Sequence, residues 1–187
     1  MAGRRGYVGI IKNYGALVGG SLAHGHQQIV LSSVVPRRLL DNARFEEERG
    51  ERYTDYILRE NADALTLADY GPARLLVPHF MRRPFDMQLV LERTSRRYLF
   101  ELDDAEVNAV ARGWRDALRL IHTLMPRLGR ELAYNVITHN GPGAGLYFEF
   151  LPYTQEWGGY EHLGLILCQA DPVQVAQQAR ALLAELG

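Results

Sequence analysis

The chain has 187 residues, 47% of them hydrophobic and 23% charged, which is enough for one globular domain with a buried core. The formal net charge is −1, so no overall positive charge points to nucleic acid or a membrane surface as a partner. Cys168 is the only cysteine, which excludes an internal disulfide, and the absence of a long apolar run or a visible secretory signal leads us to expect a cytoplasmic protein.

The first third of the chain predicts two strands followed by helix. Residues 7–14, YVGIIKNY, are rich in aromatic and β-branched side chains and predict a strand. Residues 15–25 hold too many glycines for a helix and predict a loop, after which residues 26–35 predict a second strand. A broken apolar stripe over residues 37–61 predicts one or two helices, interrupted near Gly50.

The remainder of the chain predicts mainly strands, with two helices. Six segments have the composition of strands: residues 64–71, 73–80, 85–93, 133–140, 145–153 and 163–169. Asp103 with Glu106 three residues later forms the capping-box pattern of a long helix that ends near Pro126. Asp171 and Pro172 predict the start of a last helix.

This order of elements predicts an α+β fold with a mainly antiparallel sheet. The two strands in residues 1–35 cannot build a core alone, so they must pack on the rest of the chain or on another subunit. We therefore expect two portions, residues 1–61 and residues 62–187, that form one compact unit.

A histidine pair follows the glycine-rich loop, in the segment KNYGALVGGSLAHGHQQ. Residues two apart on a strand point to the same face, so His24, His26 and Gln28 would share one face. A neutral imidazole such as that of His26 is a nucleophile toward phosphorus, and the Gln28 amide could stabilise charge on a phosphate oxygen. Backbone amides between Asn13 and Ser21 could cradle that phosphate. The alternative is two ordinary histidines at the surface or half-buried.

Two further features are open to a functional and an ordinary interpretation. Arg82 and Arg83 could hold phosphates, but adjacent arginines before a strand are more typical of a solvated turn. Trp157 lies in a glycine-bearing loop and could stack on a base or a sugar, with packing against the sheet as the alternative.

The segment NYGALVGGSLAHGHQQI resembles the active-site segment of galactose-1-phosphate uridylyltransferase and its relatives in the histidine-triad superfamily. That family has Asn-x-Gly, Gly-x-Ser and His-Pro-His-x-Gln at the same spacing. The matching residues are Asn13, Gly15, Gly19, Ser21, His24, His26 and Gln28. The proline between the two histidines is replaced here by Gly25.

This resemblance implies a histidine-triad-like antiparallel sheet and assigns a role to most of these residues. It implies that His26 takes up a nucleoside monophosphate, that Gln28 holds its phosphate, and that His24 supports the site. The residues that it implies on the phosphate side are Asn13, Gly19, Gly20 and Ser21.

The resemblance continues more weakly along the chain. Residues 74–93 resemble the family's Val-Pro strand pair, and residues 133–140 and 145–153 resemble the two strands that follow. The segment Gly-Gly-Tyr-Glu, which ends in Tyr160 and Glu161, resembles one that contacts the sugar and reaches the active site of the neighbouring subunit in the family.

Departures from the family pattern matter for metals and for assembly. The family region upstream of the first strand is absent, so we expect a relative that is shortened at the N-terminus. His139 and Glu149 stand at metal-site positions, but Tyr147 replaces a metal-binding histidine, and we predict no structural metal and no cofactor. An open strand edge near residues 7–14, and a family active site built between two subunits, lead us to expect a homodimer.

Three hypotheses remain open. The first is a nucleotidyltransferase that acts on a nucleotide sugar or related nucleotide and a phosphorylated acceptor through a covalent intermediate on His26. The second is a nucleotide hydrolase or phosphorylase of the same superfamily. The third is a catalytically inactive relative that binds a nucleotide or a protein partner; none of the three involves nucleic acid or a membrane.

Overall fold

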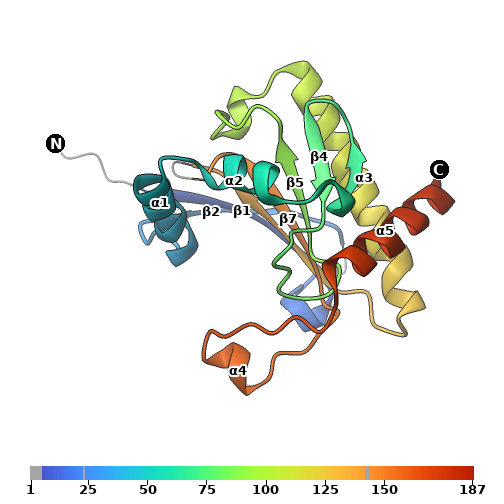
Figure 1. The fold of residues 1–187 in the computed structure, drawn as a ribbon. Coiled ribbons are helices and arrows are strands. Elements are labelled where there is room, and N and C mark those ends of the chain that lie inside the picture. Colours follow the sequence, from blue (N-terminus) through green and yellow to red (C-terminus); the bar gives the residue numbers. More distant parts are fainter. Residues whose placement is uncertain (1–5, 23, 142–143) are drawn as a thin grey trace.

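The structure, a computed structural model, describes residues 6–22, 24–141 and 144–187. Its strands form one antiparallel seven-stranded sheet in the order β2-β1-β6-β7-β5-β4-β3 (Figure 1). The strands are β1 (Tyr7–Tyr14), β2 (Gln28–Ser32), β3 (Thr66–Asp69), β4 (Ala73–Leu76), β5 (Met87–Leu91), β6 (Tyr134–His139) and β7 (Tyr147–Pro152). The α+β prediction is confirmed.

The α-helices are α1 (Arg37–Arg49), α2 (Tyr53–Glu60), α3 (Asp104–Arg127), α4 (Gly159–His162) and α5 (Pro172–Leu186). The predicted helical break at Gly50 is confirmed, because this residue adopts a left-handed φ of 70° at the end of α1. The capping box of α3 is also confirmed: Glu106 N donates to Asp103 Oδ1 at 2.9 Å, and Asp103 N donates to Glu106 Oε2 at 2.9 Å. No helix in the described part of the chain is long and apolar enough to cross a membrane.

Helices cover the two faces of the sheet unequally. On one face α3 lies over β4, β5 and β7, and α5 packs against α3 and β3, which buries the larger core around Leu89, Phe148 and Phe150. On the opposite face α2 packs on β5 and buries a smaller cluster that includes Ile57 and Tyr147. We call this second side the α2 face; the candidate site lies there.

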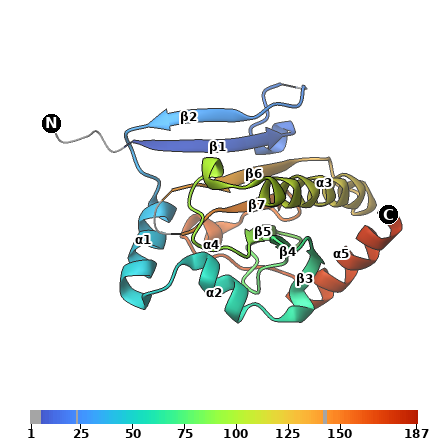
Figure 2. The ribbon, with the colours of Figure 1, turned by 90° about the horizontal axis from the view of Figure 1, so that it is seen from above.

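The β1–β2 hairpin extends the sheet beyond the cover of α3 (Figure 2). Val8 pairs with Leu31 and Ile10 with Ile29, so these four apolar side chains share the face on which α3 lies. Ile29 and Leu31 are 75% and 77% exposed. The edge of the sheet therefore carries an uncovered apolar strip on one side.

The strand predicted over residues 163–169 is wrong. This segment belongs to an arm that carries α4 and projects from the body (Figure 1). Its described backbone hydrogen bonds go to α4 and to side chains: Leu165 N donates to Tyr160 O at 2.9 Å, Leu167 O accepts from Gln155 Nε2 at 2.7 Å, and Gln169 N donates to Gln155 Oε1 at 3.2 Å. An apolar, strand-like composition does not make a strand where no neighbouring strand is available to pair with it.

Candidate active site

Strand register brings the residues of the histidine motif into one row across the sheet. Asn13 of β1 pairs with Asn135 of β6, and Asn135 pairs with Leu151 of β7. On the other side of β1, Ile11 pairs with Gln28, so continuing this register by two residues sets His26 opposite Asn13. Side chains at opposed positions lie on the same face, which here is the α2 face. β2 begins at Gln28, so His24 and His26 precede the paired strand, and their sharing of the α2 face with Gln28 stays a prediction.

The ring of His26 is oriented by the backbone two residues before it. His26 Nδ1 lies 2.8 Å from His24 O. A carbonyl oxygen only accepts hydrogen bonds, so Nδ1 carries the proton and the lone pair of the neutral ring lies on Nε2. His26 is half-buried, and its backbone carbonyl accepts a hydrogen bond from Lys12 Nζ at 3.2 Å. His24 thus contributes its carbonyl, while its own side chain is exposed.

Glycines shape the loop that precedes the histidines. Gly15 has a φ of +93°, and a Cβ there would lie 2.7 Å from Leu132 O. A Cβ on Gly20 would lie 2.7 Å from Gly15 O, which accepts the Gly20 N–H at 2.9 Å. These short distances leave no room for a side chain at Gly15 or Gly20, which explains why glycine occurs at both positions.

Asn13 lies beside this loop with donors available. Asn135 Nδ2 donates to Asn13 Oδ1 at 2.8 Å and to Val18 O at 3.1 Å. This arrangement occupies the Asn13 oxygen and leaves its Nδ2 group without a partner in the described part of the chain, consistent with the predicted contact to phosphate. The N–H groups of Gly19 and Gly20 donate within the loop and Ser21 is exposed, so their contact to phosphate stays a prediction.

The predicted sugar-binding residues lie on the arm. Tyr160 is 61% exposed, and Glu161 caps its own short helix by accepting from Gly158 N at 2.9 Å and Leu167 N at 3.3 Å. No hydrogen bond in the described ranges joins either residue to β1 or β2. Their contact to a sugar therefore stays a prediction.

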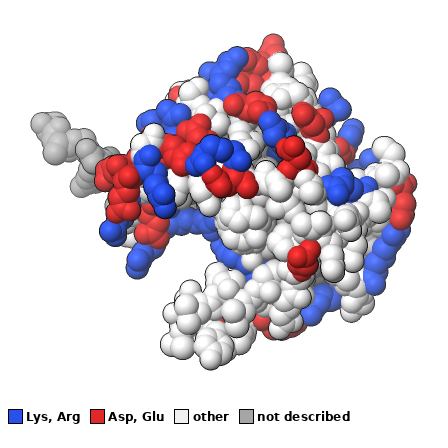
Figure 3. Space-filling model, viewed as in Figure 1, with Lys and Arg blue, Asp and Glu red and all other residues white. Residues whose placement is uncertain are grey.

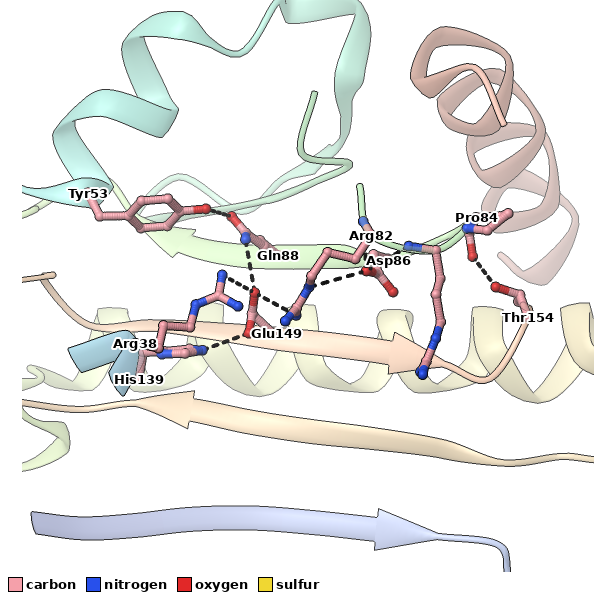
Figure 4. Close-up of polar contacts among 10 residues, drawn as sticks. Arg38, Tyr53, Arg82, Pro84, Asp86, Gln88, His139, Glu149 and Thr154 are labelled. Carbon is pink, nitrogen blue, oxygen red and sulfur yellow. Dashed lines mark hydrogen bonds and ion pairs between the residues drawn. The ribbon is translucent and has the colours of Figure 1, made fainter. Parts of the chain in front are cut away.

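A buried polar cluster centred on Glu149 of β7 was not predicted from the sequence (Figure 4). Glu149 Oε1 accepts from Arg38 at 2.9 Å and from Arg82 at 3.2 Å. Gln88 Nε2 lies 3.3 Å from the same oxygen, and His139 Nε2 lies 2.7 Å from Glu149 Oε2. The cluster joins α1 and the turn before β5 to the centre of the sheet.

The charges in this cluster are set by burial and by pairing. Burial alone would raise the pKa of Glu149, but His139, Arg82 and Arg38 hold it well below its usual range. Burial lowers the pKa of His139 against the attraction of Glu149. We therefore assign an ionised carboxylate that accepts from a neutral imidazole and two guanidinium groups.

His139 and Glu149 were the positions at which the family resemblance implied a metal, and these residues do not fit one. No group of three or more metal-ligating side chains occurs in the described ranges. The two potential ligands bind each other, and the guanidinium groups of Arg38 and Arg82 bring positive charge to the remaining carboxylate oxygen. The two guanidinium groups thus neutralise the Glu149 carboxylate, which is the role that a metal cation would have here.

Two cavities flank Ile137 on the α2 face. One, of about 380 Å³, is mostly apolar and is lined by residues of β1, β2, β6 and the start of α1, together with Arg38 and His139. The other, of about 220 Å³, lies beside Asn135 and is lined by Arg82, Arg83, Asp86, Asn135, Ile137, Leu151 and Trp157. We call the second the arginine cavity. Figure 3 shows the molecule hollowed between α1 and the arm, with basic side chains on the inner wall.

The interpretation of Arg82 and Arg83 as a solvated turn is wrong. Both are half-buried, Arg82 is bound to Glu149, and the guanidinium of Arg83 lies 4.9 Å from the centre of the Tyr153 ring and 5.0 Å from that of Trp157. The sequence held no signal for these contacts, because Arg82 and Glu149 are 67 residues apart.

No family model matches the sequence. The fold is nevertheless that of solved uridylyltransferase structures. One uridylyltransferase structure matches with a TM-score of 0.84 and 22% identity over 98% of this chain and 62% of that chain. This chain therefore spans less than two thirds of that protein's length.

Two proteins from Arabidopsis thaliana have the same fold. A GalT-like protein matches with a TM-score of 0.75 and 22% identity, over 95% of this chain and 62% of that chain. An ADP-glucose phosphorylase with bound ADP-glucose matches with a TM-score of 0.76 and 22% identity, over 95% of this chain and 59% of that chain. The antiparallel sheet predicted from the sequence is thus shared with these solved structures at the level of the fold.

Asp86 offers a test of the electrostatics of the arginine cavity. Burial raises the pKa of Asp86 to about 7, although Arg82 opposes the shift. An unfolded aspartate titrates near pH ~3.9, so between these values the folded state holds a proton that the unfolded state lacks, and stability falls as pH rises. We predict that the difference in melting temperature, wild type minus Asp86→Asn, falls from pH 4.5 to 7 and then levels off. A difference that is constant over this range would show that Asp86 ionises normally.

Proposed function

We propose that the chain is a nucleotidyltransferase-like enzyme that acts on a nucleotide sugar through a covalent intermediate on His26. The observation that carries the proposal is the hydrogen bond between His26 Nδ1 and His24 O, because it leaves the lone pair of the neutral ring on Nε2. The fold shared with a uridylyltransferase and an ADP-glucose phosphorylase supports the same chemistry.

The reaction has two displacements at one phosphorus atom. His26 Nε2 attacks the phosphorus that bears the nucleoside, a P–N bond forms, and the P–O bond to the sugar phosphate breaks. The electron pair of that bond leaves with the sugar phosphate, so no proton is needed. An oxygen of the phosphorylated acceptor then attacks the same phosphorus, and the P–N bond breaks to restore the imidazole.

Neighbouring side chains have matching roles in this proposal. Gln28 and Asn13 lie on the α2 face, and with His26 placed there by extension of the β1–β2 register, their amide N–H groups can donate to the non-bridging oxygens as charge develops. The apolar cavity of about 380 Å³ begins at Ile11 and Val30 and offers a place for the nucleoside.

The proposal leaves a phosphorylase or hydrolase as the second candidate, favoured by the similarity to the ADP-glucose phosphorylase. In that case inorganic phosphate or water resolves the intermediate in place of a sugar phosphate. Both candidates share the first displacement and differ only in the acceptor, so product analysis with sugar 1-phosphate, with inorganic phosphate and with neither distinguishes them.

We predict that incubation with UDP-glucose or ADP-glucose adds one nucleoside monophosphate to the protein, seen as an acid-labile mass increase in intact-mass spectra. His26→Asn abolishes the increase because the amide has no nucleophilic nitrogen lone pair. His79→Asn, which alters an exposed histidine outside this row, serves as the control and keeps it. A wild type that gains no mass but is thermally stabilised by nucleotide would instead indicate an inactive binding relative. An adduct on His26→Asn would remove His26 from the mechanism.

We also propose that the chain forms a homodimer through the β1–β2 edge. The free edge of β2 and the apolar strip of Val8, Ile10, Ile29 and Leu31 support this assembly, because an exposed strand edge with apolar neighbours favours pairing with another chain. The contact of Tyr160 and Glu161 with the sugar in a partner's site is part of this proposal and rests on the family resemblance alone.

The doubly substituted variant Ile29→Lys/Leu31→Lys is predicted to be a monomer in size-exclusion chromatography with light scattering, where the wild type is a dimer. Both substitutions add charge to the apolar strip without altering the α2 face. Val173→Lys, at a 40% exposed position on α5, is the matched control and stays dimeric. A monomeric wild type, or a dimeric double variant, contradicts this assembly.

A further inference from the structure

Arg83 is a half-buried cation without an acidic partner. Arg83 forms no ion pair within 4 Å in the described part of the chain, and its Nε atom is buried without a hydrogen-bond partner. Burial lowers its pKa, and the more distant carboxylates of Asp86 and Glu156 only partly oppose this. By contrast, Arg82 and Arg38 both bind Glu149. A partly buried guanidinium without a close anionic partner lowers stability and is a ready binding group for an anion.

Aromatic rings hold this cation in place. The guanidinium of Arg83 lies over the rings of Tyr153 and Trp157, at 4.9 Å and 5.0 Å from their centres. Such contacts favour a positive charge but leave the N–H groups at the edge of the guanidinium plane available to a ligand. Arg83 and Trp157 both line the arginine cavity, so the fixed charge is directed at an accessible space.

The backbone that presents Arg83 is strained. Phe85 has a φ of 67°, the one positive value of a non-glycine residue in the described ranges. The turn is kept in this conformation by Thr154 Oγ1, which donates to Pro84 O at 2.6 Å, and by Asp86 Oδ2, which accepts from Arg83 N at 3.2 Å (Figure 4). A bulky residue in the left-handed region is uncommon and persists where surrounding contacts enforce it, often at ligand sites.

The position of the cavity restricts what it can bind. Its wall includes Asn135, which lies two strands away from His26 in the row, or about 10 Å at the usual strand spacing. A phosphate bonded directly to the reacting phosphorus stays beside His26. Under the proposed mechanism, a substituent on the far side of the sugar ring is the part of the substrate that can span this distance.

We propose that the arginine cavity binds a second anionic group, a phosphate monoester or a carboxylate, carried by the sugar part of the substrate remote from the reacting phosphorus. Arg83 donates to this group, and Trp157 offers an apolar wall to the sugar ring. The direction in which the substrate extends rests on the proposed function, whereas binding of the anion does not.

Asp86 also lines this cavity, and its charge opposes an anion. Burial raises the pKa of Asp86 to about 7, so near neutral pH a large fraction of this carboxyl group is protonated and uncharged. The buried Oδ1 atom has no partner in the described part of the chain and in the protonated form the carboxyl group is a potential donor to the ligand.

Calorimetric titration at pH 6.5 tests the proposal with glucose 1-phosphate, glucose 1,6-bisphosphate and glucuronic acid 1-phosphate. The wild type is expected to bind one or both of the doubly anionic sugars at least ~10-fold more tightly than glucose 1-phosphate, which is the effect of a charge-assisted hydrogen bond. The stronger of the two identifies phosphate or carboxylate as the preferred group.

Arg83→Gln is expected to reduce this preference to about onefold, because the amide retains polarity without the charge, whereas Arg83→Lys retains part of it. Arg127→Gln, which removes a surface arginine paired with Glu185, is the matched control and keeps the full preference. If Arg83→Gln does not fold, as judged by thermal melting, Arg83→Lys replaces it: a partial loss of the preference supports the proposal, and an unchanged preference contradicts it.

The proposal is overturned if the wild type binds all three sugars equally or binds none measurably, or if the Arg83 variants keep the preference. Formation of the His26 adduct is a separate readout. An adduct without the anion preference refutes the arginine cavity alone, and the anion preference without an adduct refutes the covalent mechanism alone.

Discussion

Antiparallel pairing of β1 with β6 is the constraint on which the site depends. It joins the two portions of the chain into one sheet and sets Asn13 beside Asn135, with Gln28 of β2 on the same face. Because successive side chains on a strand alternate between faces, a shift of one residue would turn Asn13 toward α3 and Lys12 toward the site. The hydrogen bond between Asn135 and Asn13 adds a side-chain contact that favours the observed register.

The Glu149 cluster lies on the same face of the sheet as this row and links β6 and β7 to α1. An ionised carboxylate that is almost fully buried is tolerated because two guanidinium groups, an amide and an imidazole satisfy its oxygens. Removing a partner from such a cluster typically lowers stability by ~3–5 kcal/mol, since a buried charge is left uncompensated. Arg38 thereby anchors α1 beside the apolar cavity, and Arg82 anchors the turn that presents Arg83 to the arginine cavity.

Much of the fold could be predicted from local patterns. The capping box at Asp103 and the break at Gly50 are local signals, and both are found where they were expected. The strand expected over residues 163–169 failed, because apolar composition does not reveal whether a pairing partner exists. For the site, the spacing from Asn13 to Gln28 predicted a shared face, and the register places Asn13 and Gln28 on it, but the contacts of Arg38, Arg82 and Arg83 join residues far apart in sequence. Such contacts depend on tertiary packing, for which a single sequence holds no periodic signal.

The central claim is that the row from His26 to Asn135 on the α2 face is one continuous binding surface for a nucleotide sugar. A crystal structure of the His26→Asn variant with bound ADP-glucose or UDP-glucose tests it most directly. We predict that the phosphate bearing the nucleoside lies between Gln28 and Asn13, with the sugar directed over Asn135. A nucleotide sugar bound on the side of α3, or with its phosphates away from residue 26 while the sheet is unchanged, would contradict the account.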